Sequence, residues 1–240
     1  MTEIIILTLV CSVTFTFEIV FGLAGTIMMV TIMTFFFDAK TLVIFSVMPQ
    51  LLTASIGLYR SQKTVNFAFL ARMLMFGSVG GVLGLILFYR FPTSVFYQTL
   101  AYAITVFGLY LVASPHIIRI HPIIQRVLDM IAGLSQTLIG ISGPIAMTRL
   151  LGSFDDKLII RNYALAFFLA MNLFRAGGYI INDTFNDQII NMMLVSGPFL
   201  AIVLWNSNHL HVKVNEYVFR KVVSWVIFIG GISLILRSPY

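Results

Sequence analysis

Apolar runs of membrane-spanning length fill almost the whole chain. A helix needs about 20 apolar residues to cross the hydrocarbon core of a bilayer, and only short polar turns separate the runs of that length found here. These runs are 3–37, 41–59, 67–89, 93–114, 122–151, 158–181, 189–205 and 214–236. The sequence therefore predicts an all-α polytopic, multi-pass membrane protein.

The composition argues against the main soluble classes. Hydrophobic residues make up 59% of the chain and charged residues 10%, whereas about a quarter of the residues in a soluble domain are charged. The single cysteine, Cys11, excludes a disulfide framework and a multi-cysteine zinc site. The net charge of +6 comes from basic residues scattered between apolar runs, which is typical of loops at a membrane surface and not of a nucleic-acid site.

No motif indicates catalysis or a cofactor. The chain has no phosphate-binding loop, and its serines and histidines show no nucleophile spacing. The histidines at 209 and 211 have no nearby cysteine or convergent carboxylate, which makes a metal site improbable. We therefore expect a protein that is not an enzyme and that holds no cofactor and no metal. Its expected partners are a small anion and the lipid bilayer.

Two of the apolar runs are too long for one crossing. As a straight helix, 3–37 would extend roughly 50 Å, against a hydrocarbon core of about 30 Å, and 122–151 has a similar excess. Each contains a glycine break near its middle, FGLAG in the first and IGISGP in the second. Such breaks at bilayer depth indicate interrupted helices that line a cavity. Each long run is then either a re-entrant hairpin or a full, kinked span.

The order of features repeats along the chain. The sequence GLAG at 22–25 matches GISG at 140–143, and the turn DAK at 38–40 matches DDK at 155–157. Three further apolar runs follow each break. Although glycine pairs recur by chance in membrane helices, the shared order predicts two copies of one unit, 1–118 and 119–240, which together form one transmembrane domain.

The distribution of basic residues favours the hairpin arrangement. If both long runs turn back at their glycines, most basic residues lie on one face, which the positive-inside rule places in the cytoplasm. That face would hold Arg60, Lys63, Arg119, Arg126, Arg149, Lys157, Arg161, Lys213, Arg220 and Lys221, and the other Lys40, Arg90 and Arg237. The two units would then be inverted repeats, as in many secondary transporters, each a broken or re-entrant helical hairpin plus three transmembrane helices.

The hairpin arrangement predicts an anion site at the two breaks. The second arms would begin near the bilayer midplane, where unpaired backbone N–H groups and the helix dipole favour an oxyanion. The candidate substrate-binding residues at the breaks are Gly22, Gly25, Thr26, Ser142, Gly143 and Pro144. The alternative is that these glycines merely allow close helix packing.

Further candidates lie within the other apolar runs. Arg175 is a substrate-binding candidate because a charge inside a membrane span costs at least about 3 kcal/mol without a partner. Alternatively, its side chain extends toward the loop that contains Asp183. Asn172, Gln50 and Ser55 offer polar side chains near the same depth, although each is equally typical of contacts between membrane helices.

Glu18 is the acidic residue placed deepest in an apolar run. It lies one turn before the first glycine break, and Gln136 takes its place before the second. Because burial favours the neutral, protonated form of a carboxyl group, one hypothesis assigns Glu18 to proton coupling. The other treats it as a structural acid, with Arg72 as a candidate partner.

The repeated pattern resembles the TauE/SafE family of sulfite and sulfonate exporters over essentially the whole chain. The resemblance rests on FGLAGTIMMVTIMTFFFDAKTLVIFSVMPQLLTASIGLYRSQKTVNF and IGISGPIAMTRLLGSFDDKLIIRNYALAFFLAMNLFRAGGY, with Ala24 and Ser142 where the family often has glycine. It implies an inner-membrane exporter of small sulfur-containing anions.

We therefore expect a secondary transporter of sulfite, a sulfonate or a similar oxyanion, with proton coupling as a hypothesis and with function as a monomer or homodimer. A passive anion channel and a non-transporting membrane scaffold subunit are the alternatives.

Overall fold

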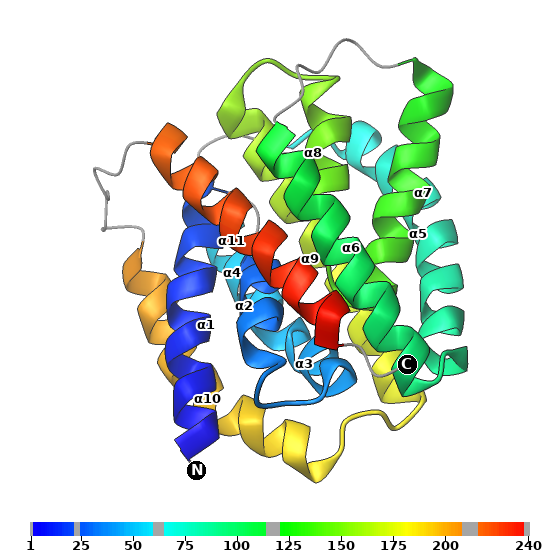
Figure 1. Ribbon diagram of the computed structural model, residues 1–240. Helices are drawn as coiled ribbons and strands as arrows, with labels where there is room; N and C mark the ends of the chain where they lie inside the picture. Colours follow the sequence, from blue (N-terminus) through cyan, green and yellow to red (C-terminus); the bar gives the residue numbers. More distant parts are fainter. Residues whose placement is uncertain (1, 22–24, 60–64, 114–120, 208–215, 238–240) are drawn as a thin grey trace.

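The computed structural model describes residues 2–21, 25–59, 65–113, 121–207 and 216–237, and their secondary structure is helical throughout (Figure 1). The helices are α1 (Thr2–Phe21), α2 (Gly25–Met33), α3 (Ala39–Phe45), α4 (Val47–Tyr59), α5 (Phe67–Arg90), α6 (Thr93–Ala113), α7 (Pro122–Ile139), α8 (Gly143–Leu151), α9 (Lys157–Ile181), α10 (Asp187–Ser207) and α11 (Glu216–Arg237).

Six helical stretches within the described residues are long and apolar enough to cross a membrane. They are Thr2–Ile19, Ala39–Tyr59, Phe67–Arg90, Thr93–Ala113, Leu158–Ile181 and Asp187–Ser207, and a shorter apolar stretch covers Ile227–Leu236. Large apolar side chains such as Leu83 on α5, Val106 on α6 and Leu194 on α10 are exposed at the surface of the bundle. Exposure of these apolar side chains to water would be unfavourable, whereas contact with the hydrocarbon core of a bilayer is not. The prediction of a multi-pass membrane protein is thereby confirmed.

Both long apolar runs are interrupted where the glycines predict it. The first run divides into α1 and α2, and the second into α7 and α8. Gly140 ends α7 with φ +73°, a left-handed conformation that glycine adopts without steric cost. Pro144 lies in the first turn of α8, where its missing N–H costs no hydrogen bond. Gly22 lies outside the described residues.

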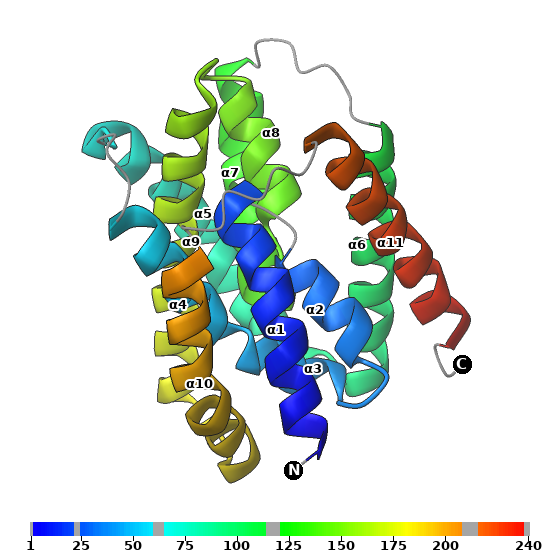
Figure 2. The same ribbon diagram turned by 90° about the vertical axis from the view of Figure 1, so that its left-hand side faces the viewer.

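In each interrupted run, the second arm turns back along the first (Figures 1 and 2). The two pairs start from opposite ends of the bundle, because α1 begins at the lower end of both views and α7 at the upper end. Each long run is therefore a longer helix followed by a short helix that turns back along it, and not a single kinked span.

The principal helix contacts join the two halves of the chain. Helix α5 packs along α7 and α10 along α1, while α4 packs on α9 and α6 on α11. The α5–α7 contact is close because of glycine, since a Cβ atom on Gly80 would overlap the carbonyl oxygen of Met130. The core that positions the site is therefore formed by helices from both halves.

The matching acidic turns perform the same local task. Asp38 Oδ2 accepts hydrogen bonds from the backbone N–H groups of Lys40 at 2.9 Å and Thr41 at 3.2 Å, and so caps α3. In the second half the cap of α9 is Asp156, whose Oδ1 accepts from Leu158 at 2.8 Å. Helix starts in both halves thus use an aspartate N-cap, and the residue that corresponds to Asp38 is Asp156, not Asp155.

The run 41–59 lies within one helical stretch of spanning length, Ala39–Tyr59, which has a one-residue interruption. It is divided into α3 and α4 at Ser46. Pro49 has no N–H to donate to the carbonyl oxygen four residues earlier, at Phe45, and this loss favours a break at that place. Ser46, at this interruption, is fully buried.

Candidate substrate site

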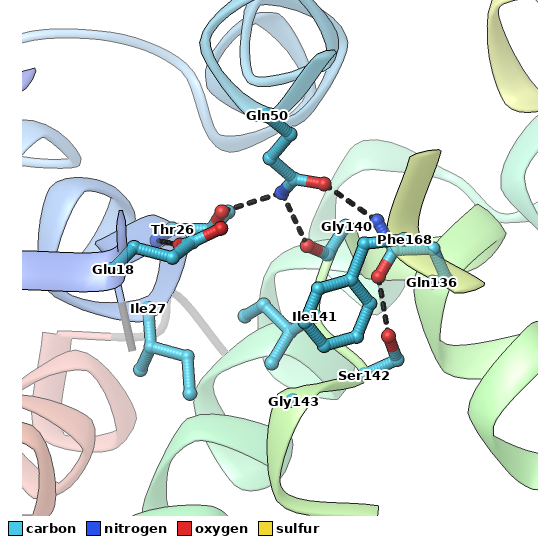
Figure 3. Close-up of a pocket in the computed structure, with 10 residues that line it drawn as sticks. All are labelled: Glu18, Thr26, Ile27, Gln50, Gln136, Gly140, Ile141, Ser142, Gly143 and Phe168. Carbon is cyan, nitrogen blue, oxygen red and sulfur yellow. Dashed lines mark hydrogen bonds between the residues drawn. The ribbon is translucent and has the colours of Figure 1, made fainter. Parts of the chain in front are cut away.

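A small buried cavity lies where the two interrupted runs meet (Figure 3). Its volume is about 20 Å³, counted as the space open to the centre of a water molecule, which is enough for one water. The cavity is lined by Glu18, Thr26, Ile27, Gln50, Gln136, Gly140, Ile141, Ser142, Gly143 and Phe168. It therefore includes the start of α2, the end of α7 and the start of α8.

Two buried glutamines join the halves across this cavity. Gln50 Nε2 on α4 donates to the Gly140 carbonyl oxygen at 2.8 Å and to Thr26 Oγ1. Gln136 Nε2 on α7 donates to Gln50 Oε1 at 2.6 Å and to Asn172 Oδ1 at 3.1 Å. Figure 3 shows Gln50 between the two helix breaks. Both N–H groups of each amide are thus engaged by acceptors of the protein.

The second break contributes a hydroxyl donor. Ser142 stands at the N-cap position of α8, but its side chain makes no capping hydrogen bond there. Its Oγ donates to Gln136 Oε1 at 2.5 Å. Asn172 lies behind this pair, fully buried, and its Nδ2 donates to the Phe168 carbonyl oxygen at 2.8 Å. Asn172 therefore supports Gln136 without lining the cavity.

Glu18 binds the start of α2. The backbone N–H of Thr26 donates to Glu18 Oε2 at 3.1 Å, and the Glu18 side chain is buried. Arg72, the partner considered from the sequence, is exposed on α5. The carboxyl group thus satisfies one of the N–H groups that a helix start leaves unpaired, as a capping residue does.

Arg175 lies fully inside the bundle, although it does not line the cavity. Its Nη1 donates to the Gln136 carbonyl oxygen at 2.9 Å and its Nη2 to Ser46 Oγ at 2.9 Å. The guanidinium group also lies over the Tyr179 ring, 5.9 Å from its centroid. A cation at the carboxyl end of α7 is stabilised by the helix dipole. Arg175 therefore holds the second break in place and does not extend to the Asp183 loop.

Some of the other predicted residues line the cavity and others do not. Thr26, Gln50, Ser142 and Gly143 line the cavity. The backbone N–H of Gly25 donates to Glu18, and Pro144, next to the lining residue Gly143, is buried. Ser55 is exposed, because five residues along a helix from Gln50 correspond to a rotation of roughly 140°. Ser55 is accordingly not part of this site.

Several lining residues were not among the sequence candidates. Gln136 and Phe168 are examples, and the repeat could have identified both, since Gln136 corresponds to Glu18 and Phe168 to Gln50. Gly140, Ile27 and Ile141 also line the cavity. Within the described residues there is no group of three His, Cys, Asp or Glu side chains able to hold a metal ion.

A buried ion pair joins the arms of the second interrupted run. Arg149 Nε on α8 lies 3.2 Å from Asp129 Oδ1 on α7, and both side chains are almost fully buried. Arg149 Nη1 donates to Ser153 Oγ at 2.5 Å, and the guanidinium group lies over the Phe69 ring at 5.0 Å. The sequence interpretation placed Arg149 on the basic face. Its contacts show that it connects α8 to α7 and α5.

The contact between the two glutamines predicts energetic coupling. We expect Gln50→Leu and Gln136→Leu each to lower the melting temperature, because each leaves a buried amide group without its partner, at a cost of about 1–3 kcal/mol. The double variant should lose less than the sum of the two. Melting temperatures in detergent would measure this, with Gln50→Leu/Gln98→Leu as the additive control, since Gln98 is on α6 outside the lining. Strict additivity of the Gln50 and Gln136 effects would contradict the coupling.

Comparison with known proteins gives one match. The family model described as "Sulfite exporter TauE/SafE" matches residues 7–234. No curated protein and no solved structure was found to match. The match covers nearly the whole chain, including both interrupted runs and every residue that lines the cavity. The resemblance stated from the repeated glycine breaks is thereby confirmed, and the chain belongs to the TauE/SafE sulfite exporter family.

Proposed function

We propose that this protein is a secondary transporter that exports small sulfur-containing oxyanions, such as sulfite or a sulfonate, from the cytoplasm. The observation that carries the proposal is that the breaks of two long runs, one from each half of the chain, line one small cavity together with buried polar side chains. Interrupted helices at bilayer depth are typical of substrate sites in secondary transporters. Membership of a family described as sulfite exporters supports the substrate class.

The chemistry of the lining suits an oxyanion. Gln50, Gln136 and Ser142 place N–H and O–H donors around the cavity, and the starts of α2 and α8 add backbone N–H groups. These side-chain donors now bind acceptors of the protein. Because the cavity holds only one water, an anion would bind after the two breaks separate and would replace those acceptors.

The helix arrangement supports inverted repeats over 1–118 and 119–240. The contact of α5 with α7 has its counterpart, with the halves exchanged, in the contact of α10 with α1. The two interrupted runs start from opposite ends of the bundle (Figure 1). In our proposal the two halves move relative to one another, so that the cavity opens to one face of the membrane at a time.

Orientation follows from the positive-inside rule. The end of the bundle at which α7 begins would face the cytoplasm in a cell inner membrane (Figure 1). Arg126 is the fifth residue of α7 and so lies close to the start of that helix. In our proposal the protein functions as a monomer or a homodimer and binds no nucleic acid. Protonation of Glu18 would couple proton movement to anion movement.

Counterflow in proteoliposomes tests this function. Vesicles loaded with excess unlabelled sulfite should accumulate labelled sulfite transiently above its equilibrium level, because a carrier exchanges one anion for another. A channel would give equilibration without the overshoot, and a scaffold would give no uptake.

We expect Ser142→Ala to lower the initial rate of sulfite counterflow about tenfold, which corresponds to about 1.4 kcal/mol from one lost hydrogen bond. Ser55→Ala, at an exposed position, is the matched control.

A further inference from the structure

Glu18 is a buried acid that forms no ion pair with a basic side chain in the part of the chain that the structure describes. Helices α2, α4 and α10 pack against α1. Neither α2 nor α4 contains an acidic or basic residue, and α10 has only Asp187, at its exposed amino end. On α1 itself, Glu3 and Cys11 lie two turns or more from Glu18. Across the cavity, Arg175 donates to Gln136 and Ser46. The carboxyl group is instead bound by backbone N–H groups at the start of α2, those of Thr26 and Gly25.

The start of α2 is shaped around this carboxyl group. A Cβ atom at Gly25 would lie 2.8 Å from Glu18 Cβ and 2.9 Å from the Thr14 carbonyl oxygen, and would overlap Glu18 Oε2. Glycine at 25 therefore allows the carboxyl group to rest directly on the first turn of α2. A carboxylate oxygen accepting a backbone N–H at a helix start is the same interaction that an oxyanion ligand makes.

The second break lacks such an internal anion. Gln136, which corresponds to Glu18, is neutral, and its amide is bound to Gln50, Asn172 and Ser142. Ser142 makes no capping bond to α8. The two sides of the cavity are therefore chemically different: among the described lining residues, the group that gains or loses a charge is Glu18, at the first break.

We propose that Glu18 is an internal competitor of the substrate: its carboxylate occupies the oxyanion position at the start of α2, and an oxyanion binds there only when Glu18 has taken up a proton and left the Thr26 N–H. This inference rests on the proposed function. The Glu18 carboxylate accepts from the same backbone N–H that an oxyanion would bind, so the two anions do not occupy the start of α2 together. Binding of one anion would accordingly take up about one proton from solution, and it would weaken as the pH rises.

Calorimetric titration of the detergent-purified protein tests the competition. The probes are thiosulfate and methanesulfonate, which both stay fully ionised between about pH 5.5 and about pH 8.5. Titrations in two buffers of different ionisation enthalpy give the number of protons taken up per anion. For the wild type we expect about one proton, and an affinity that falls about tenfold per pH unit where Glu18 is ionised.

Glu18→Gln isolates the charge. The amide keeps an oxygen to accept from the Thr26 N–H but takes up no proton, so we expect no proton uptake and an affinity independent of pH. Glu3→Gln removes an exposed acid from the same helix and should behave as the wild type does. Wild-type binding that is independent of pH and without proton uptake would overturn the competition while leaving the proposed function standing. Binding of neither probe at any pH would contradict the proposed function, and the competition with it. The proton count of the wild type decides the matter even if Glu18→Gln fails to fold.

Discussion

Arg175→Met is expected to slow anion transport by about two orders of magnitude. The guanidinium group makes two hydrogen bonds of 2.9 Å, to the Gln136 carbonyl oxygen and to Ser46 Oγ. It thereby ties the end of α7 to the junction of α3 and α4. Hydrogen bonds from a charged group contribute about 1.5–3 kcal/mol each, and about 2.7 kcal/mol corresponds to a hundredfold change in rate. Initial rates of sulfite counterflow in proteoliposomes would measure the loss.

The control for this variant lies on the same helix. Arg161→Met removes another arginine of α9, which is half-buried and lies roughly 20 Å farther toward the helix start, and it should keep most of the transport rate. Arg175→Lys retains the charge but not the planar pair of donors, so we expect partial recovery. Wild-type rates for Arg175→Met in well-folded protein would show that the arginine does not position the second break.

Asp129→Ala is expected to reduce the free energy of unfolding by about 3–5 kcal/mol. The substitution leaves Arg149 buried among α7, α8 and the Phe69 ring without its carboxylate partner. An uncompensated buried charge is far more costly than the absence of the whole pair. A marked fall in the melting temperature in detergent would be the direct readout.

The double variant separates charge burial from shape. In Asp129→Ala/Arg149→Met the unpaired charge is gone, and a flexible apolar side chain occupies much of the arginine's space. We expect it to recover most of the lost stability. If Asp129→Ala alone melts at the wild-type temperature, the ion pair does not stabilise the second interrupted run.

The breaks in the long runs were predictable because they depend on local sequence. Gly140 permits the positive φ that ends α7, and Pro144 suits the first turn of α8. The exclusion of Ser55 was also within reach, since the 3.6-residue helical period separates it from the face that carries Gln50. The correspondence of Gln136 with Glu18 pointed to one further lining residue.

The partners of the polar side chains were not predictable in this way. The sequence left Arg175 between a substrate role and an extended side chain, whereas it binds the end of α7. It offered Arg72 as a partner for Glu18, whereas the carboxyl group turns back to the Thr26 N–H. The Asp129–Arg149 pair gave no local signal at all.

The sequence alone thus determined an all-helical membrane protein with two interrupted runs, because hydrophobic length and backbone preference act over a few neighbouring residues. Only the tertiary structure decided that Gln50 reaches Gly140, ninety positions away, and that Gln136 meets Gln50 beside the Glu18 carboxyl group. Such contacts depend on how each helix is rotated and packed against the others. That rotation is set by the summed contacts of the whole bundle and not by any one segment.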